Sequence, residues 1–159
     1  MPKTPSKVIS SGDPAAPDFE PDNYLFITLA YANHHYAERI AHALRSTGTD
    51  RSRWRVLMAL TVKTVSSIKD LSELTTINQS TLSKIIERMK RDGWIETSNR
   101  PSDSRVTDVK PTAIGREVLA KLVQIASKEY RAALAGVSDA ELATTLATLK
   151  KIGVNLQRY

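Results

Sequence analysis

The sequence contains no cysteine, and this single absence excludes several kinds of site. Structural disulfides, metal sites built on thiolates and redox sensing through thiols all need cysteine sulfur. Long apolar runs are missing as well: none approaches the roughly 20 residues that a membrane-spanning helix needs. The first residues lack the apolar core of a secretory signal. We therefore expect a cytoplasmic protein with no membrane partner.

Signatures of catalysis are also absent from the 159 residues. There is no glycine-rich phosphate loop, no His-Glu-x-x-His pair and no serine in a nucleophile elbow. The three histidines, His34, His35 and His42, all fall within one short stretch. We predict that the protein is not an enzyme and that it holds no cofactor and no metal.

The charge is moderately basic and unevenly distributed. The chain has 23 Lys and Arg against 17 Asp and Glu, a net charge of +6, which favours a polyanionic partner such as nucleic acid. Residues 51–63 hold four cations and no acid, and residues 79–116 hold eight cations and five acids. Residues 1–22 instead carry two cations and four acids. The positive charge therefore gathers in the middle of the chain.

The spacing of apolar residues predicts a mainly α protein of one-domain size with a small β-hairpin. Five prolines in residues 1–21 predict a flexible N-terminal arm, and Asp22 or Asn23 is the expected cap of the first helix. The predicted helices cover residues 22–46, 51–64, 67–75, 78–92, 113–135 and a final segment from about 139, and the predicted strands cover 94–98 and 105–109.

The segment 78–92 predicts a helix that could lie in a DNA major groove. Leu82, Ile85, Ile86 and Met89 form one apolar stripe at spacings of three and four. Amides, hydroxyls and cations occupy the other side, where long donors reach base edges and short hydroxyls reach phosphates. The alternative is a solvated helix face. The DNA contacts that we expect from this helix are Gln79, Ser80, Thr81, Ser83, Lys84 and Arg88.

The hairpin that follows adds a second predicted contact with DNA. Arg105 is the candidate for the minor groove, with Arg100 beside it, and the alternative is a simple exposed charge. We expect Asp103, two residues before Arg105, to brace that arginine or to close the turn. Ser67 and Lys69, near the start of the third helix, are expected to touch phosphate.

These motifs resemble the MarR family of winged helix-turn-helix regulators. The resemblance covers residue 24 to the C-terminus. One departure is Pro111, where the family usually has leucine, so we expect a slightly altered base of the wing. The matching wing residues, in the family's spacing, are Asp103, Arg105, Val109, Thr112 and Gly115; further matches are Trp54–Leu57, Thr81–Ser83, Ile85, Ile86, Met89 and Asp92–Ile95.

The resemblance implies a homodimer that binds double-stranded DNA at a palindromic operator, with half-sites about one helical turn, ~34–36 Å, apart. It implies four regions: the arm (1–21), a dimerisation helix (22–50), the DNA-binding domain (51–112) and C-terminal dimerisation helices (113–159). The excess apolar surface of the terminal helices also favours a dimer. The usual outcome in the family is repression, relieved by a small, often aromatic, anionic ligand.

Six residues at the junction of the first two helices are the candidate effector site. Three interpretations compete: a metal site, a pocket that binds an anion while an aromatic side chain packs on its ring, and ordinary packing with solvated charge. The cationic lining favours an anionic effector, either an aromatic carboxylate or its coenzyme A thioester. The six residues are His35, Tyr36, Arg39, His42, Trp54 and Arg55.

The main alternative to an operator-binding repressor is a winged helix that contacts protein or RNA without operator specificity. The two functions differ in salt dependence and in duplex preference. A DNA reader binds duplex with a steep salt slope, about −0.9 for each phosphate neutralised. A module for protein contacts lacks that slope.

Overall fold

The computed structural model describes residues 7–157 of the chain. The chain forms two compact units, residues 1–129 and residues 130–159, and each is described by itself. The predicted arm falls partly outside the described residues, because residues 1–6 do, and so do the last two residues of the predicted C-terminal region.

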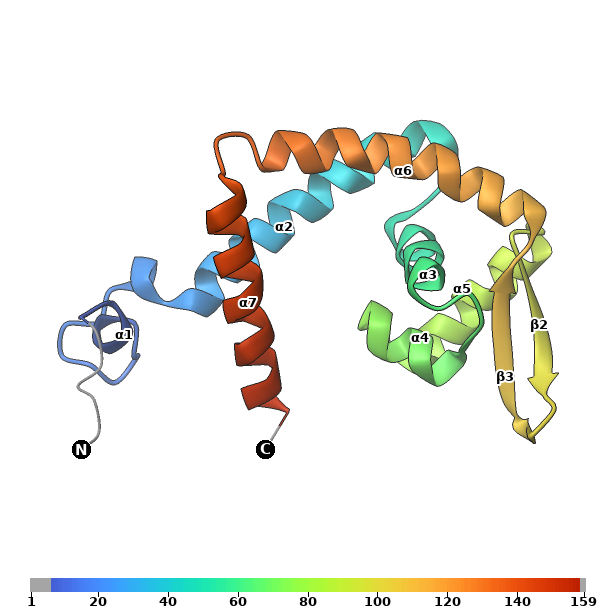
Figure 1. Ribbon diagram of the computed structural model, residues 1–159, viewed down its shortest axis with the longest axis horizontal. Helices are drawn as coiled ribbons and strands as arrows, with labels where there is room; N and C mark the ends of the chain where they lie inside the picture. Colours follow the sequence, from blue (N-terminus) through green and yellow to red (C-terminus); the bar gives the residue numbers. More distant parts are fainter. Residues whose placement is uncertain (1–6, 158–159) are drawn as a thin grey trace. The chain divides into compact units, whose positions relative to one another are not determined.

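Three short helices and an antiparallel hairpin form the centre of the first unit (Figure 1). Each helix begins at a polar cap, because the first N–H groups of a helix have no partner within it. Asp50 accepts from the backbone of Arg53, Ser67 from that of Asp70, and Asn78 from that of Thr81. The helices are α3 (Arg51–Val62), α4 (Ile68–Thr75) and α5 (Gln79–Arg91).

The sheet has three antiparallel strands in the order β1-β3-β2: β1 (Ser66–Ser67), β2 (Ile95–Arg100) and β3 (Asp103–Pro111). Pro111 pairs with Ile95 and is the last residue of the ladder, so β3 extends two residues beyond the predicted strand end at 109. The strand β1 is not predicted, because a run of two residues carries no readable alternation. With the helices, this hairpin confirms the predicted fold class, a mainly α chain with a β-hairpin wing.

The wing motif has a structural reason at its base. The Thr112 hydroxyl donates to the Gly93 carbonyl over 2.6 Å and accepts from the Gly115 backbone over 3.0 Å, which caps the start of α6 (Ala113–Ala133). A Cβ at Gly115 would collide with the backbone carbonyl of Trp94. Only glycine therefore lets α6 begin against the chain that enters β2.

One apolar core joins the elements of the first unit. The predicted stripe of α5 is confirmed, since Leu82, Ile86 and Met89 are fully buried. They lie in the same cluster as residues of α2 (Leu25–Leu44) and α6. An ion pair of 2.6 Å between Arg39 and Glu129 also links α2 to α6. Both long helices are thus fixed to the three-helix centre as far as residue 129.

The residues before α2 differ from the predicted arm. A short helix, α1 (Lys7–Ser11), and a 3-10 turn, η1 (Pro21–Asn23), precede α2, and a second 3-10 turn, η2 (Arg45–Thr47), follows it. Tyr24 stands at the N-cap of α2 without a side-chain bond, so the prediction of Asp22 or Asn23 as the cap is wrong. The proline turn shifts the helix start and leaves the Asn23 side chain to donate to the Ser11 hydroxyl.

The second unit contains α7 (Asp139–Leu156). A capping box closes its start: the Ser138 hydroxyl accepts from the Glu141 backbone, and the Glu141 carboxylate accepts from the Ser138 backbone. Several apolar side chains of α7 are exposed, among them Leu146, Val154 and Leu156. Across residues 7–157, no helix combines the length and the apolar content required to span a membrane.

Candidate nucleic-acid interface

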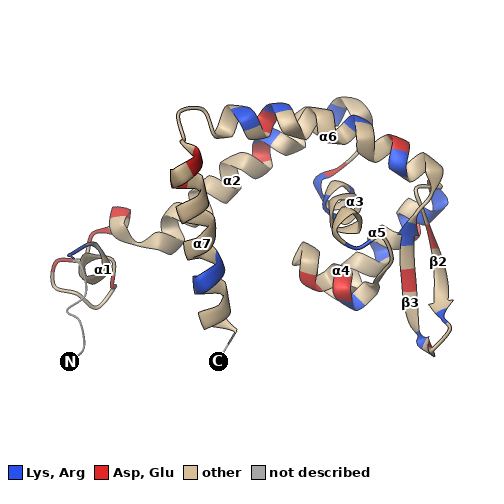
Figure 2. Cartoon of the chain, in the orientation of Figure 1, with Lys and Arg blue, Asp and Glu red and all other residues tan. Residues whose placement is uncertain are grey.

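A hollow of about 420 Å³ lies between α4, the start of α5 and the wing. It brings together residues that are far apart in sequence, and six of its ten lining residues were predicted to contact DNA. Lys and Arg gather on α5 and on the hairpin, and acidic residues lie on α4 and β3 (Figure 2). The predicted residues that line this hollow are Ser67, Lys69, Gln79, Ser83, Arg100 and Arg105.

The polar face of α5 divides into short and long side chains. The Ser80 hydroxyl donates to the Asn78 side chain over 2.9 Å, and the Ser83 hydroxyl donates to the Gln79 carbonyl over 2.8 Å. The other predicted contacts on this helix, Gln79, Thr81, Lys84 and Arg88, are exposed. The long side chains are therefore the groups that can reach a base edge or a phosphate.

The tip of the wing is built as predicted. Asp103 accepts from the Arg105 backbone over 3.1 Å, which closes the turn, and also accepts from the Arg105 guanidinium over 3.1 and 3.3 Å. These hydrogen bonds from Arg105 hold the pKa of the Asp103 carboxyl below its usual value. The Arg105 side chain remains 89% exposed. A bracing carboxylate therefore orients an accessible guanidinium.

Arg100 has a partner that the sequence does not indicate. Its guanidinium makes two bonds to Asp108 on the neighbouring strand, of 2.6 and 3.2 Å. The pair lowers the pKa of Asp108 and raises that of Arg100, chiefly through these hydrogen bonds. Arg100 lines the hollow, but its side chain is only 36% exposed, so it is a weaker candidate for a phosphate contact than the more exposed Arg105.

At the start of α4 the two predicted phosphate contacts differ. Lys69 is exposed, whereas Ser67 is buried and its hydroxyl caps the helix by accepting from Asp70. The Lys63 ammonium donates to the Asp70 carboxylate over 2.8 Å, and this bond is the main reason that the pKa of Asp70 is lowered. A phosphate can therefore reach the exposed Lys69 ammonium more easily than the buried Ser67 hydroxyl.

Arg53 is a structural residue that sequence reasoning missed. Its buried guanidinium donates to Asp50, to Asp92 beyond the end of α5, and to the Gly48 carbonyl, and it lies 4.8 Å from the centroid of the Trp94 ring. The contacts with Asp50 and Gly48 are local in sequence, whereas those with Asp92 and Trp94 are not. Arg53 thus links the start of α3 to the C-terminal end of α5, the helix predicted to lie in the major groove.

The predicted effector residues do not all line one hollow. Tyr36, Trp54 and Arg55 line a hollow of about 220 Å³ between α2 and α3, here called the α2–α3 hollow. Arg39 and His42 instead line a separate hollow of about 390 Å³ that includes Glu129. The reason is helical rotation: Arg39 turns to α6, where it pairs with Glu129.

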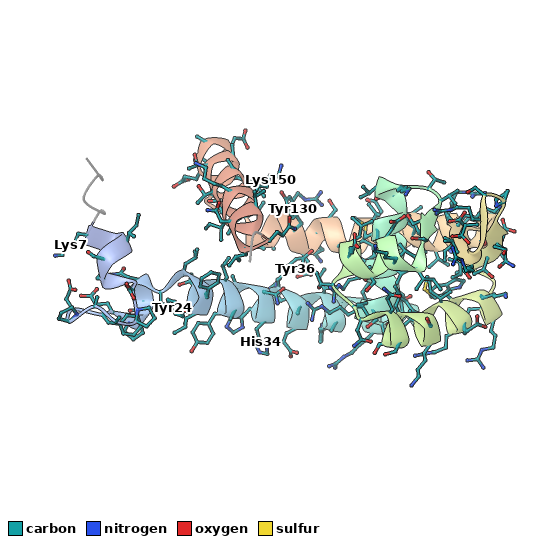
Figure 3. The ribbon with its side chains drawn as sticks, turned by 90° about the horizontal axis from the view of Figure 1, so that it is seen from below. Lys7, Tyr24, His34, Tyr36, Tyr130 and Lys150 are labelled. Carbon is teal, nitrogen blue, oxygen red and sulfur yellow. The ribbon has the colours of Figure 1, made fainter. Side chains whose placement is uncertain are left out.

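The histidines also lie apart from the α2–α3 hollow. His34 and Tyr36 leave opposite sides of α2 (Figure 3), and the exposed His35 ring packs edge-on against His34 with 5.5 Å between centroids. Among residues 7–157, no group of three His, Asp or Glu side chains is arranged to hold a metal ion.

The α2–α3 hollow contains a second cation that was not predicted as a site residue, Arg51. Burial, and then the charge of Arg51, lower the pKa of Arg55. The Arg55 guanidinium donates to the Thr76 hydroxyl over 2.6 Å. Two arginines on successive turns of α3 beside a tyrosine and a tryptophan form a lining suited to an aromatic anion.

Comparison with known proteins agrees with this geometry. The model of the MarR family matches residues 47–106, which span most of the helix-turn-helix and the wing. The HTH-type transcriptional repressor IacR of Pseudomonas putida is 30% identical over 148 residues, covering 93% of this chain and 89% of the relative. The transcriptional activatory protein BadR of Rhodopseudomonas palustris is 29% identical, covering 96% of this chain and 89% of that protein.

Among solved structures, Bordetella bronchiseptica BpsR, whose DNA binding is regulated by 6-hydroxynicotinic acid, is similar with a TM-score of 0.72 and 25% identity. The similarity covers 84% of this chain and 99% of BpsR. The curated relatives are regulators of transcription, not enzymes.

Proposed function

The protein belongs to the MarR family of DNA-binding transcriptional regulators, and from this premise we propose that it is a homodimeric repressor released by a small aromatic anion. The observation that carries the proposal is the shared hollow in which Lys69, Gln79 and Arg105 meet. These three side chains come from α4, α5 and the wing. Each element alone would be a solvated surface, but together they suit one duplex.

The DNA-binding domain that we propose is residues 51–112. In this assignment α5 enters the major groove, where Gln79 can pair with adenine and Lys84 or Arg88 with guanine or phosphate. Arg105 reaches the adjacent minor groove, as expected for a wing. The relative that is 30% identical, IacR, is a transcriptional repressor, whereas BadR is a transcriptional activatory protein.

Dimerisation would involve residues 22–50 and 113–159. The start of α2 exposes large apolar side chains in the single chain, with Tyr31 64% and Phe26 44% exposed, beside Leu25 and Ile27. Apolar surface of this kind on consecutive turns marks an interface. A two-fold dimer would place two equivalent reading helices against two half-sites of a palindrome.

For the effector we propose the α2–α3 hollow. Arg51 and Arg55 would hold a carboxylate, and Tyr36 or Trp54 would pack on the ring. A volume of about 220 Å³ suits a single-ring acid better than a coenzyme A thioester. The regulation of BpsR by 6-hydroxynicotinic acid supports this chemical class.

The test uses the full chain and the best duplex that it selects from a random library. Light scattering should give a dimer, and 6-hydroxynicotinate, benzoate and phenylacetate should each be titrated into the complex while anisotropy is measured. At least one acid is expected to release the DNA, and Arg51→Gln should raise the concentration needed, whereas Lys121→Gln should not. A monomer, or release that is unaffected by Arg51→Gln, contradicts the proposal.

A further inference from the structure

Thr76 has an unusual backbone conformation at a functionally important place. Within residues 7–157 it is the only residue other than glycine with a positive φ, +50°. This left-handed conformation is unfavourable for a β-branched side chain unless its surroundings hold it. Thr76 is the C-cap of α4, two residues before Asn78, the residue that caps the reading helix α5.

The side-chain bond to Thr76 comes from outside the helix-turn-helix. Arg55 on α3 donates from Nη2 to the Thr76 hydroxyl over 2.6 Å. Within the turn, the Ser72 hydroxyl donates to the Ile77 carbonyl over 2.7 Å, and Asn78 accepts from the Thr81 backbone. Hydrogen bonds to three successive residues, Thr76, Ile77 and Asn78, therefore hold the turn that leads into α5.

The same arginine lines the α2–α3 hollow. Arg51 lies in that lining as well, and its charge disfavours the charged form of Arg55. An anion in the hollow would relieve that repulsion. A carboxylate that docks on the edge of the guanidinium that carries this Nη2 hydrogen competes with the Thr76 hydroxyl for the same donor.

We propose that Arg55 couples ligand binding in the α2–α3 hollow to the turn between α4 and α5, the turn of the helix-turn-helix. Without ligand, Arg55 donates to Thr76 and holds the left-handed turn that sets the start of α5. A bound carboxylate takes the donor edge of Arg55, the turn relaxes, and Gln79 at the first position of α5 loses its register with the DNA. This inference rests on the proposed function and assigns its regulation to one hydrogen bond.

A double-mutant cycle in the absence of ligand tests the bond. Thr76→Val keeps the shape and removes the acceptor, and Arg55→Gln removes the charged donor. Each is expected to weaken binding of the selected duplex about tenfold, the scale of a lost charge-assisted hydrogen bond. The double variant should be no weaker than either single variant, because both remove the same interaction.

Two further variants separate this role from simple destabilisation. Thr76→Ser keeps a hydroxyl and should restore near-wild-type DNA affinity. Thr145→Val is the matched control, because the Thr145 hydroxyl donates to the Glu141 carbonyl within its own helix, α7. Amide hydrogen exchange at residues 77–81 should become faster in Thr76→Val and in Arg55→Gln, with the melting temperature recorded for each.

Each outcome decides the matter. Additive losses in the cycle, or unchanged affinity in Thr76→Val, overturn the role of Arg55. A variant too unstable to assay is replaced by Arg55→Lys, whose point charge does not reproduce the fork and should also speed exchange at residues 77–81. If the wild type selects no sequence, the proposed function fails, and the exchange measurement alone still decides whether Arg55 holds the turn.

Discussion

At the tip of the wing, one aspartate makes an exposed arginine ready to bind DNA. Asp103 both closes the turn and orients the Arg105 guanidinium, so little rotamer freedom remains to be lost when the arginine enters a groove. An exposed ion pair of this kind adds little to folding stability. Its value lies in the position of the charge.

Replacing Arg105 by alanine should therefore weaken DNA binding without unfolding the protein. The salt slope of the binding constant is expected to become shallower by about one unit, since one phosphate contact is lost. Anisotropy titrations at a series of salt concentrations measure the slope. Lys121→Ala, which removes an exposed cation on α6, is the control. An unaltered slope in Arg105→Ala would remove this residue from the contacts.

Gly115 is a residue whose importance lies in folding. A Cβ at this position would meet the Trp94 carbonyl, and backbone atoms cannot move aside as a flexible side chain can. Gly115→Ala should lower the free energy of unfolding by about 1–3 kcal/mol, as overpacking does. Urea denaturation measures this loss, and Ala120→Ser on the exposed side of the same helix is expected to change little. Wild-type stability in Gly115→Ala would contradict this packing.

At the scale of elements, two carboxylates make the wing and the start of α4 sensitive to acid. Asp70 and Asp108 each have a pKa below the usual value, chiefly because of hydrogen bonds from Lys63 and Arg100. A carboxylate with a lowered folded-state pKa contributes stability above its unfolded pKa of about 4, and that contribution is lost as the pH falls through the folded value.

The urea midpoint should therefore be constant near neutral pH and fall below about pH 4. Asp108→Asn should make the acid limb less steep, because Arg100 then has no titrating partner, whereas Glu117→Gln on α6 should leave the limb as it is. Urea titrations followed by circular dichroism at each pH measure the midpoint of the wild type and of both variants. An acid limb of equal steepness in Asp108→Asn would show that the pair does not contribute.

Local chemistry explains how much of the elements could be predicted. Apolar stripes are local signals, so α3, α4 and α5 agree with the predicted helices. The strand β1 and the start of α2 do not, since β1 exists only through pairing with β3 and the turn at Pro21–Asn23 replaces the expected cap.

In the candidate sites, too, local signals could be predicted and contacts between distant segments could not. Six of the eleven predicted DNA contacts meet in one hollow, because the winged fold brings the start of α4, the start of α5 and the wing together. The predicted effector residues line separate hollows because Arg39 bonds to Glu129, 90 residues later. Helical spacing alone does not reveal that contact. Arg53 joins Asp92 across 39 residues, and no local pattern marks that contact.

At the scale of the whole molecule, the exposed apolar side chains at the start of α2 and on α7 require cover. We propose that a second copy of the chain provides this cover. Two reading helices, one from each copy, then face one duplex and bind its two half-sites together. The dimer as a unit, and not the single chain, is therefore expected to recognise a palindrome.

Selection from a random duplex DNA library with the purified full chain, at two salt concentrations, is the decisive experiment for this mode of binding. We predict an inverted repeat with half-sites about one helical turn apart, enriched at both salt concentrations. The absence of any enriched motif, with equally weak binding to every duplex, would contradict operator recognition by a dimer and turn the search to protein or RNA partners of the winged helix.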